Sequence, residues 1–130
     1  MKLNHLYKVL TEHADGRLSS ACQNTSFPEH LRVYYTPGEI AFPPKGRLFA
    51  FTTYERAKRF TDLSSRYVIY KAITSSKLYK DKPVDINFLK RFQKLAWQKL
   101  MKRAKIEFYF QAIDMTDTCT VTHLTITERL

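Results

Sequence analysis

Glycine and cysteine are both scarce in this chain, and each scarcity excludes a class of protein. The 130 residues include three glycines, Gly16, Gly38 and Gly46, which lie too far apart to form a glycine-rich phosphate loop. The two cysteines, Cys22 and Cys119, are too few for a disulfide framework. A reducing compartment is therefore expected, with both thiols as small core residues.

Long apolar runs are missing as well. No segment approaches the roughly 20 apolar residues that a membrane-spanning helix needs, and residues 1–8 lack the continuous apolar region of an export signal. The sequence therefore predicts a soluble cytoplasmic protein with no membrane partner.

Metal-binding patterns are also missing. The four histidines, His5, His13, His30 and His123, show no metal-ligand spacing, and neither cysteine lies in a pair motif. We predict no structural metal and no cofactor. The segment from His123 to Thr125 has the histidine-x-threonine form of two-histidine phosphoesterases, but no second copy is present. A histidine at a strand bulge is the better interpretation.

Acidic residues are few relative to basic ones. Lysine and arginine number 22 against 12 aspartates and glutamates, which gives a formal net charge of +10 at pH 7. Such a surplus favours an anionic partner, namely nucleic acid, a nucleotide or the acidic surface of a nucleoprotein. A basic but inert soluble domain is the alternative.

Hydrophobic and aromatic residues are plentiful, at 44% and 14% of the chain. These shares indicate a globular protein, and the length fits a single domain over residues 1–130. Residues 46–73 predict a strand, a capped helix and a second strand. Residues 48–51 form the first strand, Thr52 or Thr53 caps a helix, and residues 67–72 form the second strand. The apolar helix residues are expected to be Tyr54, Ala57, Phe60 and Leu63.

The flanking sequence predicts mostly strands. Residues 3–10 and 17–22 flank Asp15-Gly16 as a hairpin, and residues 75–83 form a loop held by Leu78 and Tyr79. Further strands are expected at 31–35, 40–42, 106–113 and 118–127, the last with a bulge near Thr122-His123.

A long helix is predicted from Ile86 to about Ala104, capped by Asp85. One face is apolar, and a basic stripe runs along the opposite face: Arg91, Lys94, Lys102 and Lys105. Aligned like charges become favourable when phosphates or carboxylates lie opposite them. A solvated helix face is the alternative. The fold class is therefore α+β, a mostly antiparallel sheet of about six or seven strands with one short and one long helix.

A second candidate patch surrounds the turn at Pro37-Gly38. Aromatic and basic residues alternate there, because Arg32, Tyr34, Tyr35 and Lys45 lie close in the sequence and Tyr7 can join them. Aromatic faces beside cations can stack a base and hold its phosphate. The alternative is that half of these tyrosines belong to the core.

Residues 46–73 resemble a segment of ADP-ribosyltransferase-like folds, in which an aromatic strand ending in threonine leads into a helix and then a strand of the type Ile-Tyr-x-Val. The resemblance covers about a fifth of the chain and implies an enzyme, or a degenerate enzyme, that acts on a dinucleotide. His5 would stand for the first catalytic position. Phe49 and Phe51 occupy the strand where a tyrosine is expected, and Glu128 matches the late acidic position poorly.

The chain is also similar in style to small proteins of bacteriophages, which often inhibit host defence. The function predicted first is a non-enzymatic binding protein for an anionic partner, such as a phage-encoded anti-defence inhibitor. The dinucleotide enzyme is the alternative, and an assembly protein with an aromatic interface is a third.

Overall fold

The computed structural model describes residues 2–21, 29, 32–44, 47–80, 84–85, 108–109 and 117–130. Within these ranges the chain forms ten strands and one helix. Their bounds are β1 (Asn4–Glu12), β2 (Leu18–Ser20), β3 (Tyr34–Tyr35), β4 (Ile40–Ala41), β5 (Leu48–Phe51), α1 (Tyr54–Thr61), β6 (Tyr67–Thr74), β7 (Val84–Asp85), β8 (Phe108–Tyr109), β9 (Thr118–Val121) and β10 (Leu124–Arg129). Strands β7 and β8 form a parallel pair, and the other eight form one antiparallel sheet.

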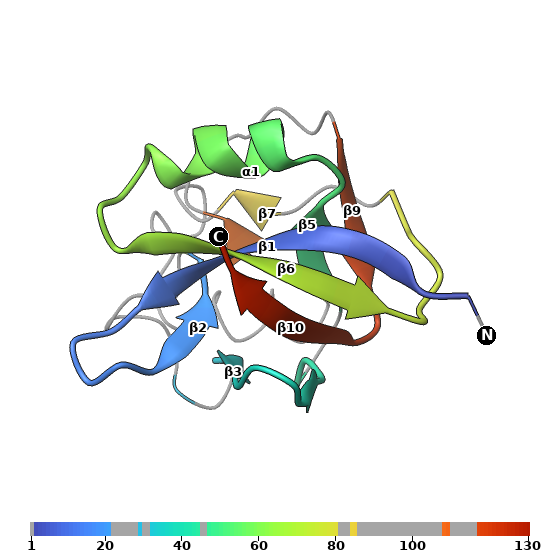
Figure 1. Ribbon diagram of the computed structural model, residues 1–130, viewed down its shortest axis with the longest axis horizontal. Coiled ribbons are helices and arrows are strands. Elements are labelled where there is room, and N and C mark those ends of the chain that lie inside the picture. The colour runs from blue at the N-terminus through green and yellow to red at the C-terminus, as the bar shows by residue number, and fades with distance from the viewer. Residues whose placement is uncertain are drawn as a thin grey trace.

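Strand β1 is the centre of this sheet (Figure 1). Along one edge it pairs with β6 in continuous antiparallel register, from Asn4 opposite Thr74 to Thr11 opposite Tyr67. Along its other edge it pairs with β5 at Tyr7 and with β2 from Leu10 onward. Strands β10 and β4 extend the sheet beyond β6, β3 extends it beyond β2, and β9 beyond β5. The sheet therefore divides into two branches on one side of β1.

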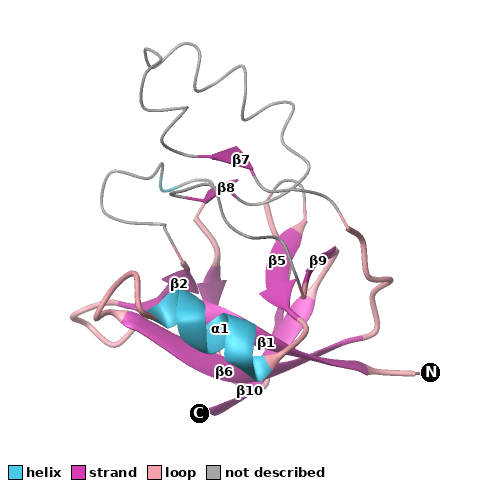
Figure 2. Cartoon of the chain, turned by 90° about the horizontal axis from the view of Figure 1, so that it is seen from above, coloured by secondary structure: helices cyan, strands magenta, loops and turns pink. Residues whose placement is uncertain are grey.

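Apolar side chains cover both faces of the sheet. One cluster lies on the face away from α1 and includes Leu6, Leu10, Leu48, Leu124 and Ile126. The other cluster lies beneath α1, which packs across β1, β5 and β6 (Figure 2), and includes Val9, Phe49, Phe51, Phe60 and Ile69. Since successive residues of a strand point to opposite faces, β1 contributes to both clusters.

Helix α1 begins at the predicted cap. The Thr53 side chain accepts a hydrogen bond from the Arg56 backbone N–H at 3.4 Å, which satisfies one of the donors left free at a helix start. Ala57 and Phe60 are buried as expected. Leu63 was expected on the same apolar face, but the helix ends at Thr61 and Leu63 is 51% exposed.

Several local predictions are confirmed. The Asp15-Gly16 hairpin closes with a hydrogen bond of 2.9 Å from the His13 N–H to the Arg17 carbonyl, and Gly16 has the positive φ of 87° that its turn requires. Strand β5 has the predicted bounds, while β3 and β4 are shorter than predicted. Tyr79 holds its loop by pairing with Thr120 on β9.

The prediction of one bulged strand over residues 118–127 is wrong. The chain breaks at Thr122-His123 into β9, which pairs with β5, and β10, which pairs with β6 and β4. The out-of-phase apolar pattern marks a change of pairing partner, and the only register shift in this region lies between Ile126 and Glu128 on β10. The bulge predicted near Thr122-His123 is therefore not present there, and the shift on β10 is a separate irregularity of its pairing with β6.

The fold class is confirmed as a mostly antiparallel sheet with a short helix. The expected number of six or seven strands is too low, because the run over 118–127 divides into β9 and β10 and because Val84–Asp85 forms a strand that the sequence did not predict. The long helix predicted over residues 86–104 lies outside the described residues. Of the strand predicted over 106–113, the structure describes Phe108–Tyr109. In the described ranges no helix is long and apolar enough to cross a membrane.

A lysine lies inside the core. Lys8 on β1 is 1% exposed, and its ammonium group donates a hydrogen bond to the backbone carbonyl of Phe49 on β5. The same ammonium lies 5.7 Å from the centre of the Tyr35 ring. Because β1 moves from β5 to β2 at this point, the Phe49 carbonyl faces the division of the sheet, and Lys8 supplies its hydrogen-bond donor. A buried carbonyl without a donor would be costly.

The hydrogen bond from the Arg56 N–H to the Thr53 side chain leads to a prediction about folding stability. We expect Thr53→Ala to lower the free energy of unfolding by about 1 kcal/mol, because the first turn of α1 loses its side-chain acceptor. Urea unfolding followed by circular dichroism measures the change. Thr53→Asp, which keeps an acceptor, should restore most of the loss. An unchanged midpoint for Thr53→Ala would show that the cap contributes nothing.

Candidate functional site

The structure describes only part of the predicted binding surface. The helical basic stripe (Arg91, Lys94, Lys102 and Lys105) and Lys45 lie outside the described residues, so the stripe stays a prediction. Arg32, Tyr34 and Tyr35 are described. They are close together in the chain, but Tyr34 and Tyr35 point to opposite faces of the sheet.

Strand alternation separates the two tyrosines. Tyr35 is 4% exposed and belongs to the core, where its hydroxyl lies 3.2 Å from the Ser20 hydroxyl. Tyr34 points the other way and remains partly exposed at the surface. The pair therefore offers a ligand the ring of Tyr34, while Tyr35 supports the strand from inside.

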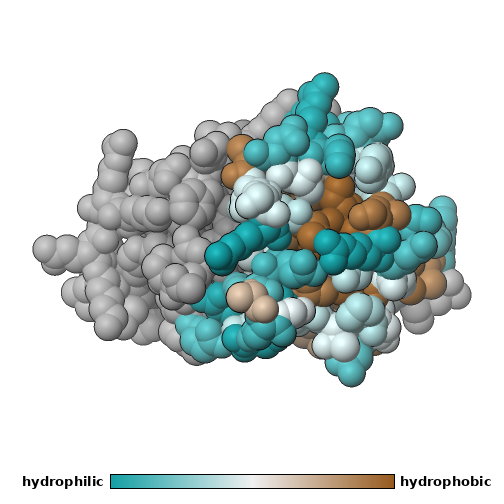
Figure 3. All heavy atoms as spheres, turned by 60° about the vertical axis from the view of Figure 1, so that its left-hand side comes forward, coloured by the Kyte–Doolittle hydropathy of each residue, from teal (hydrophilic) through white to brown (hydrophobic). Residues whose placement is uncertain are grey.

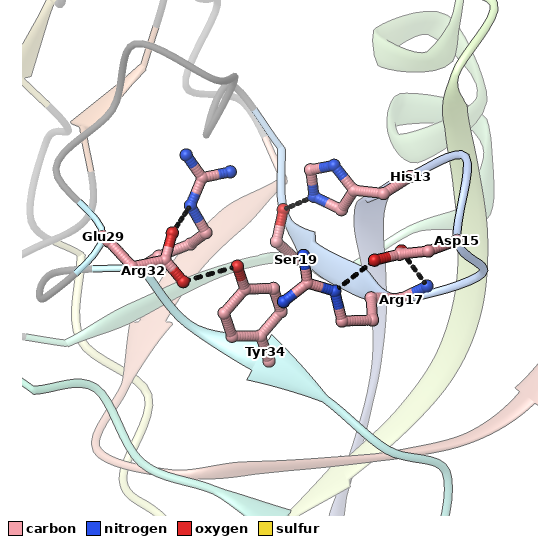
Figure 4. Close-up of polar contacts among 7 residues, drawn as sticks. All are labelled: His13, Asp15, Arg17, Ser19, Glu29, Arg32 and Tyr34. Carbon is pink, nitrogen blue, oxygen red and sulfur yellow. Dashed lines mark hydrogen bonds and ion pairs between the residues drawn. The ribbon is translucent and has the colours of Figure 1, made fainter.

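Tyr34 is the centre of a polar cluster at the β1–β2 turn (Figure 4). The Arg17 guanidinium lies 4.8 Å from the centre of the Tyr34 ring, and the His13 ring lies 6.4 Å from it. The Tyr34 hydroxyl donates to Glu29 Oε1 at 2.8 Å, and Arg32 Nε lies 3.2 Å from Glu29 Oε2. The hairpin carries Arg17 back over β3, which is why residues far apart in the sequence meet here.

The cluster contains its own counter-charges. Asp15 Oδ2 lies 2.7 Å from Arg17 Nε, and Glu29 pairs with Arg32, so two carboxylates face two guanidinium groups. The hydrogen bonds from Arg17 lower the pKa of Asp15, and the hydrogen bond to Glu29 raises the pKa of Tyr34. The two carboxylates orient both arginines and offset their charges. Little net charge is therefore left for an anionic ligand.

His13 reports the electrostatic potential at this cluster. Burial of its ring lowers its pKa below the ordinary 6.5, and the Arg32 charge lowers it further. Arg17 and Arg66 act in the same direction, whereas Asp15 raises the pKa. The Nε2 atom of His13 lies 2.7 Å from the Ser19 hydroxyl, so the neutral imidazole keeps a hydrogen-bond partner. The arginines therefore outweigh Asp15 at this ring.

A second cluster of cations and an aromatic ring lies at the β9 edge, and the sequence reasoning did not single it out. The Arg47 guanidinium lies 4.0 Å from the centre of the Tyr79 ring, and the Lys77 ammonium lies 5.4 Å from it. Lys80 follows directly in the chain. We call these four residues, Arg47, Lys77, Tyr79 and Lys80, the β9-edge cluster.

Main-chain pairing holds this cluster in place. Tyr79 and Thr120 exchange backbone hydrogen bonds of 2.9 and 2.8 Å. Arg47 Nε donates to the Thr120 hydroxyl at 3.2 Å, and Lys80 Nζ donates to the Thr118 carbonyl at 3.3 Å. Among the described residues, neither Lys77 nor Lys80 forms an ion pair with a carboxylate. Within the described part of the chain, Lys77 and Lys80 thus lack the carboxylate partners that Asp15 and Glu29 provide at the Tyr34 cluster.

The remaining chemical candidates are scattered. His5 is exposed on β1, and Glu128 on β10 pairs with Lys71 at 3.6 Å. Cys119 is buried, which raises the pKa of its thiol, while Cys22 lies outside the described residues. The part of the chain that the structure describes contains no group of three or more histidine, cysteine or acidic side chains that could hold a metal ion.

No protein-family model, curated protein or solved structure matches this chain.

The balance of charges around His13 predicts opposite effects of two exposed neighbours. We expect Arg17→Gln to raise the pKa of His13, because a cation is removed and Asp15 is left without its partner. Asp15→Asn should lower the pKa further. Titration of the His13 ring followed by NMR measures both changes.

The lowered pKa also fixes the sign of a stability effect. The unfolded chain binds more protons at this residue than the folded chain, so the contribution of His13 to folding stability is lost as the pH falls below about 6.5. A measured pKa at or above 6.5 in the folded protein, or shifts of the same sign in the two variants, would contradict this picture.

Proposed function

We propose that this protein is a small basic binding protein that engages nucleic acid through its cationic surface, with single strands as the preferred form. The observation that supports this most is the β9-edge cluster, in which Arg47 and Lys77 flank the Tyr79 ring and Lys80 adds a further charge. Single-strand binding proteins combine cations that follow the phosphates with aromatic rings on which bases stack. A net charge of +10 attracts the same partner over longer distances.

The chemistry of the described surface agrees with this assignment. The face seen in Figure 3, which is the left-hand side of Figure 1 and lies away from β9, carries many hydrophilic residues around a smaller hydrophobic group. Lys77 and Lys80 are exposed, and Tyr79 is partly exposed. The helical basic stripe, if it faces solvent as its periodicity predicts, would add further phosphate contacts. Inhibition of a nucleic-acid-guided defence complex is one role that such a protein would serve.

Fluorescence anisotropy with a labelled single strand, a duplex and an RNA strand at two salt concentrations tests the proposal. We expect binding to the single strand to weaken steeply with salt, because each neutralised phosphate releases counterions. In Lys77→Gln/Lys80→Gln the slope of log affinity against log salt should fall by about 0.7 for each lost phosphate contact. Tyr79→Leu should weaken binding by about 1–3 kcal/mol through loss of stacking, with little change in slope.

A control variant separates a site from general attraction. Lys58 and Arg59 are exposed on α1, so Lys58→Gln/Arg59→Gln removes the same charge elsewhere. Equal weakening by the two double variants would mean diffuse attraction and no site at the β9 edge. A third variant, with Arg91, Lys94, Lys102 and Lys105 changed to Gln, tests the helical stripe separately. No binding to any of the three probes would overturn the proposal.

A further inference from the structure

The turn between β9 and β10 places His123 beside the end of β6. Its Nε2 lies 2.9 Å from the Ser75 hydroxyl, and its Nδ1 lies 3.0 Å from the Thr122 hydroxyl. A hydroxyl, an imidazole and a third group that orients the imidazole are the parts from which activated serine nucleophiles are built. None of these residues belongs to the β9-edge cluster.

The hydrogen bonds around Ser76 determine which nitrogen of His123 carries the proton. The Ser76 hydroxyl donates to the Lys77 carbonyl at 2.8 Å and accepts from the Thr122 backbone N–H at 3.0 Å. It also accepts from the Thr122 hydroxyl at 3.1 Å. With its proton directed at Ser76, the Thr122 oxygen presents a lone pair to His123 Nδ1.

It follows that Nδ1 carries the proton and that Nε2 has a free lone pair. This lone pair accepts the proton of the Ser75 hydroxyl, which is the arrangement that a general base requires. The tautomer thus follows from a chain of hydrogen bonds in which Thr122 donates to Ser76 and Ser76 donates to the Lys77 carbonyl. Thr122 acts as a positioning residue in this chain.

The core holds the pair rigidly while leaving the nucleophile accessible. The Thr74 hydroxyl donates to the His123 carbonyl at 2.6 Å and accepts from the Ser76 N–H at 3.0 Å. Thr74 and Ser76 are 2% and 5% exposed, whereas Ser75 between them points to solvent. Alternation along the end of β6 therefore places two anchoring hydroxyls inside and one reactive hydroxyl outside.

Apolar surface lies next to the pair. The Phe42 ring centre is 5.8 Å from that of His123, and Phe42 is 66% exposed. Ile40, on the strand β4 that pairs with β10, is 58% exposed. Exposed apolar side chains beside a nucleophile favour a substrate with an apolar group near its reacting carbon.

We propose that Ser75 is a nucleophile, with His123 as its general base, toward carboxylic esters that carry an apolar acyl group. The Ser75 oxygen forms a bond to the acyl carbon, and the bond from that carbon to the leaving oxygen breaks. The Ser75 proton passes to His123 Nε2 and then to the leaving oxygen. Water, deprotonated by the same nitrogen, then releases the carboxylic acid and restores the Ser75 hydroxyl.

Labelling with an alkyl fluorophosphonate tests the nucleophile directly, since the serine oxygen displaces fluoride and the mass gain is located by fragmentation. We expect the label on Ser75. It should be lost in Ser75→Ala and slowed by about 100-fold or more in His123→Gln, because general base catalysis contributes at least this much. Ser65, an exposed serine in another turn, serves as the control, and Ser65→Ala should label normally.

Two further measurements extend the test to the base and to the substrate class. NMR of the imidazole nitrogens should show the proton on Nδ1, and Thr122→Val should abolish this preference. Release of p-nitrophenolate from p-nitrophenyl butyrate should be faster with the intact protein than with Ser75→Ala. Equal ester cleavage by these two proteins, labelling that is unchanged in His123→Gln, or an unlabelled Ser75 would each overturn the proposal.

Discussion

The pairing of β1 with β6 is the interaction on which the rest of the structure depends. Their register runs without a break from Asn4 opposite Thr74 to Thr11 opposite Tyr67. Every other strand of the main sheet joins one of these two directly or through a neighbour. A slip of one residue would turn the apolar residues of β1 toward the wrong clusters, because side chains alternate between the faces. The same register places Ser75 beside the β9–β10 turn and carries the hairpin to Tyr34.

The division of the sheet has a chemical consequence, which is a cation in the core. Where β1 changes partner from β5 to β2, the ladder leaves the Phe49 carbonyl facing inward, and the Lys8 ammonium reaches it from β1. The Tyr35 ring lies over the same ammonium. Burial of a charge is costly unless hydrogen bonds and aromatic faces compensate it. This small polar centre therefore ties three strands together at the point where the sheet divides.

The two clusters of cations and aromatic rings differ in their counter-charges, and therefore in whether they stabilise the fold or offer charge to a ligand. At Tyr34 the arginines meet Glu29 and Asp15, so the cluster is nearly neutral and stabilises the hairpin against β3. At the β9 edge Lys77 and Lys80 have no carboxylate partner among the described residues. Sequence reasoning selected Arg32 and Tyr34 of the first cluster because they are close in the chain, and it missed Arg17, which the hairpin brings to Tyr34. It passed over the second because Arg47 and Tyr79 meet only through β9.

Local sequence determined the elements whose causes are local. The Thr53 cap, the Gly16 turn and the bounds of β5 all follow from residues within a few positions of one another. Alternation also determined that Tyr34 and Tyr35 face opposite sides. Tertiary structure decided what depends on distant pairing: the break at Thr122-His123, the burial of Lys8, and the meetings of Arg47 with Tyr79 and of Ser75 with His123. A single strand carries no information about which partner it will find, because backbone hydrogen bonds are the same for every sequence and the choice is made by packing of the whole sheet.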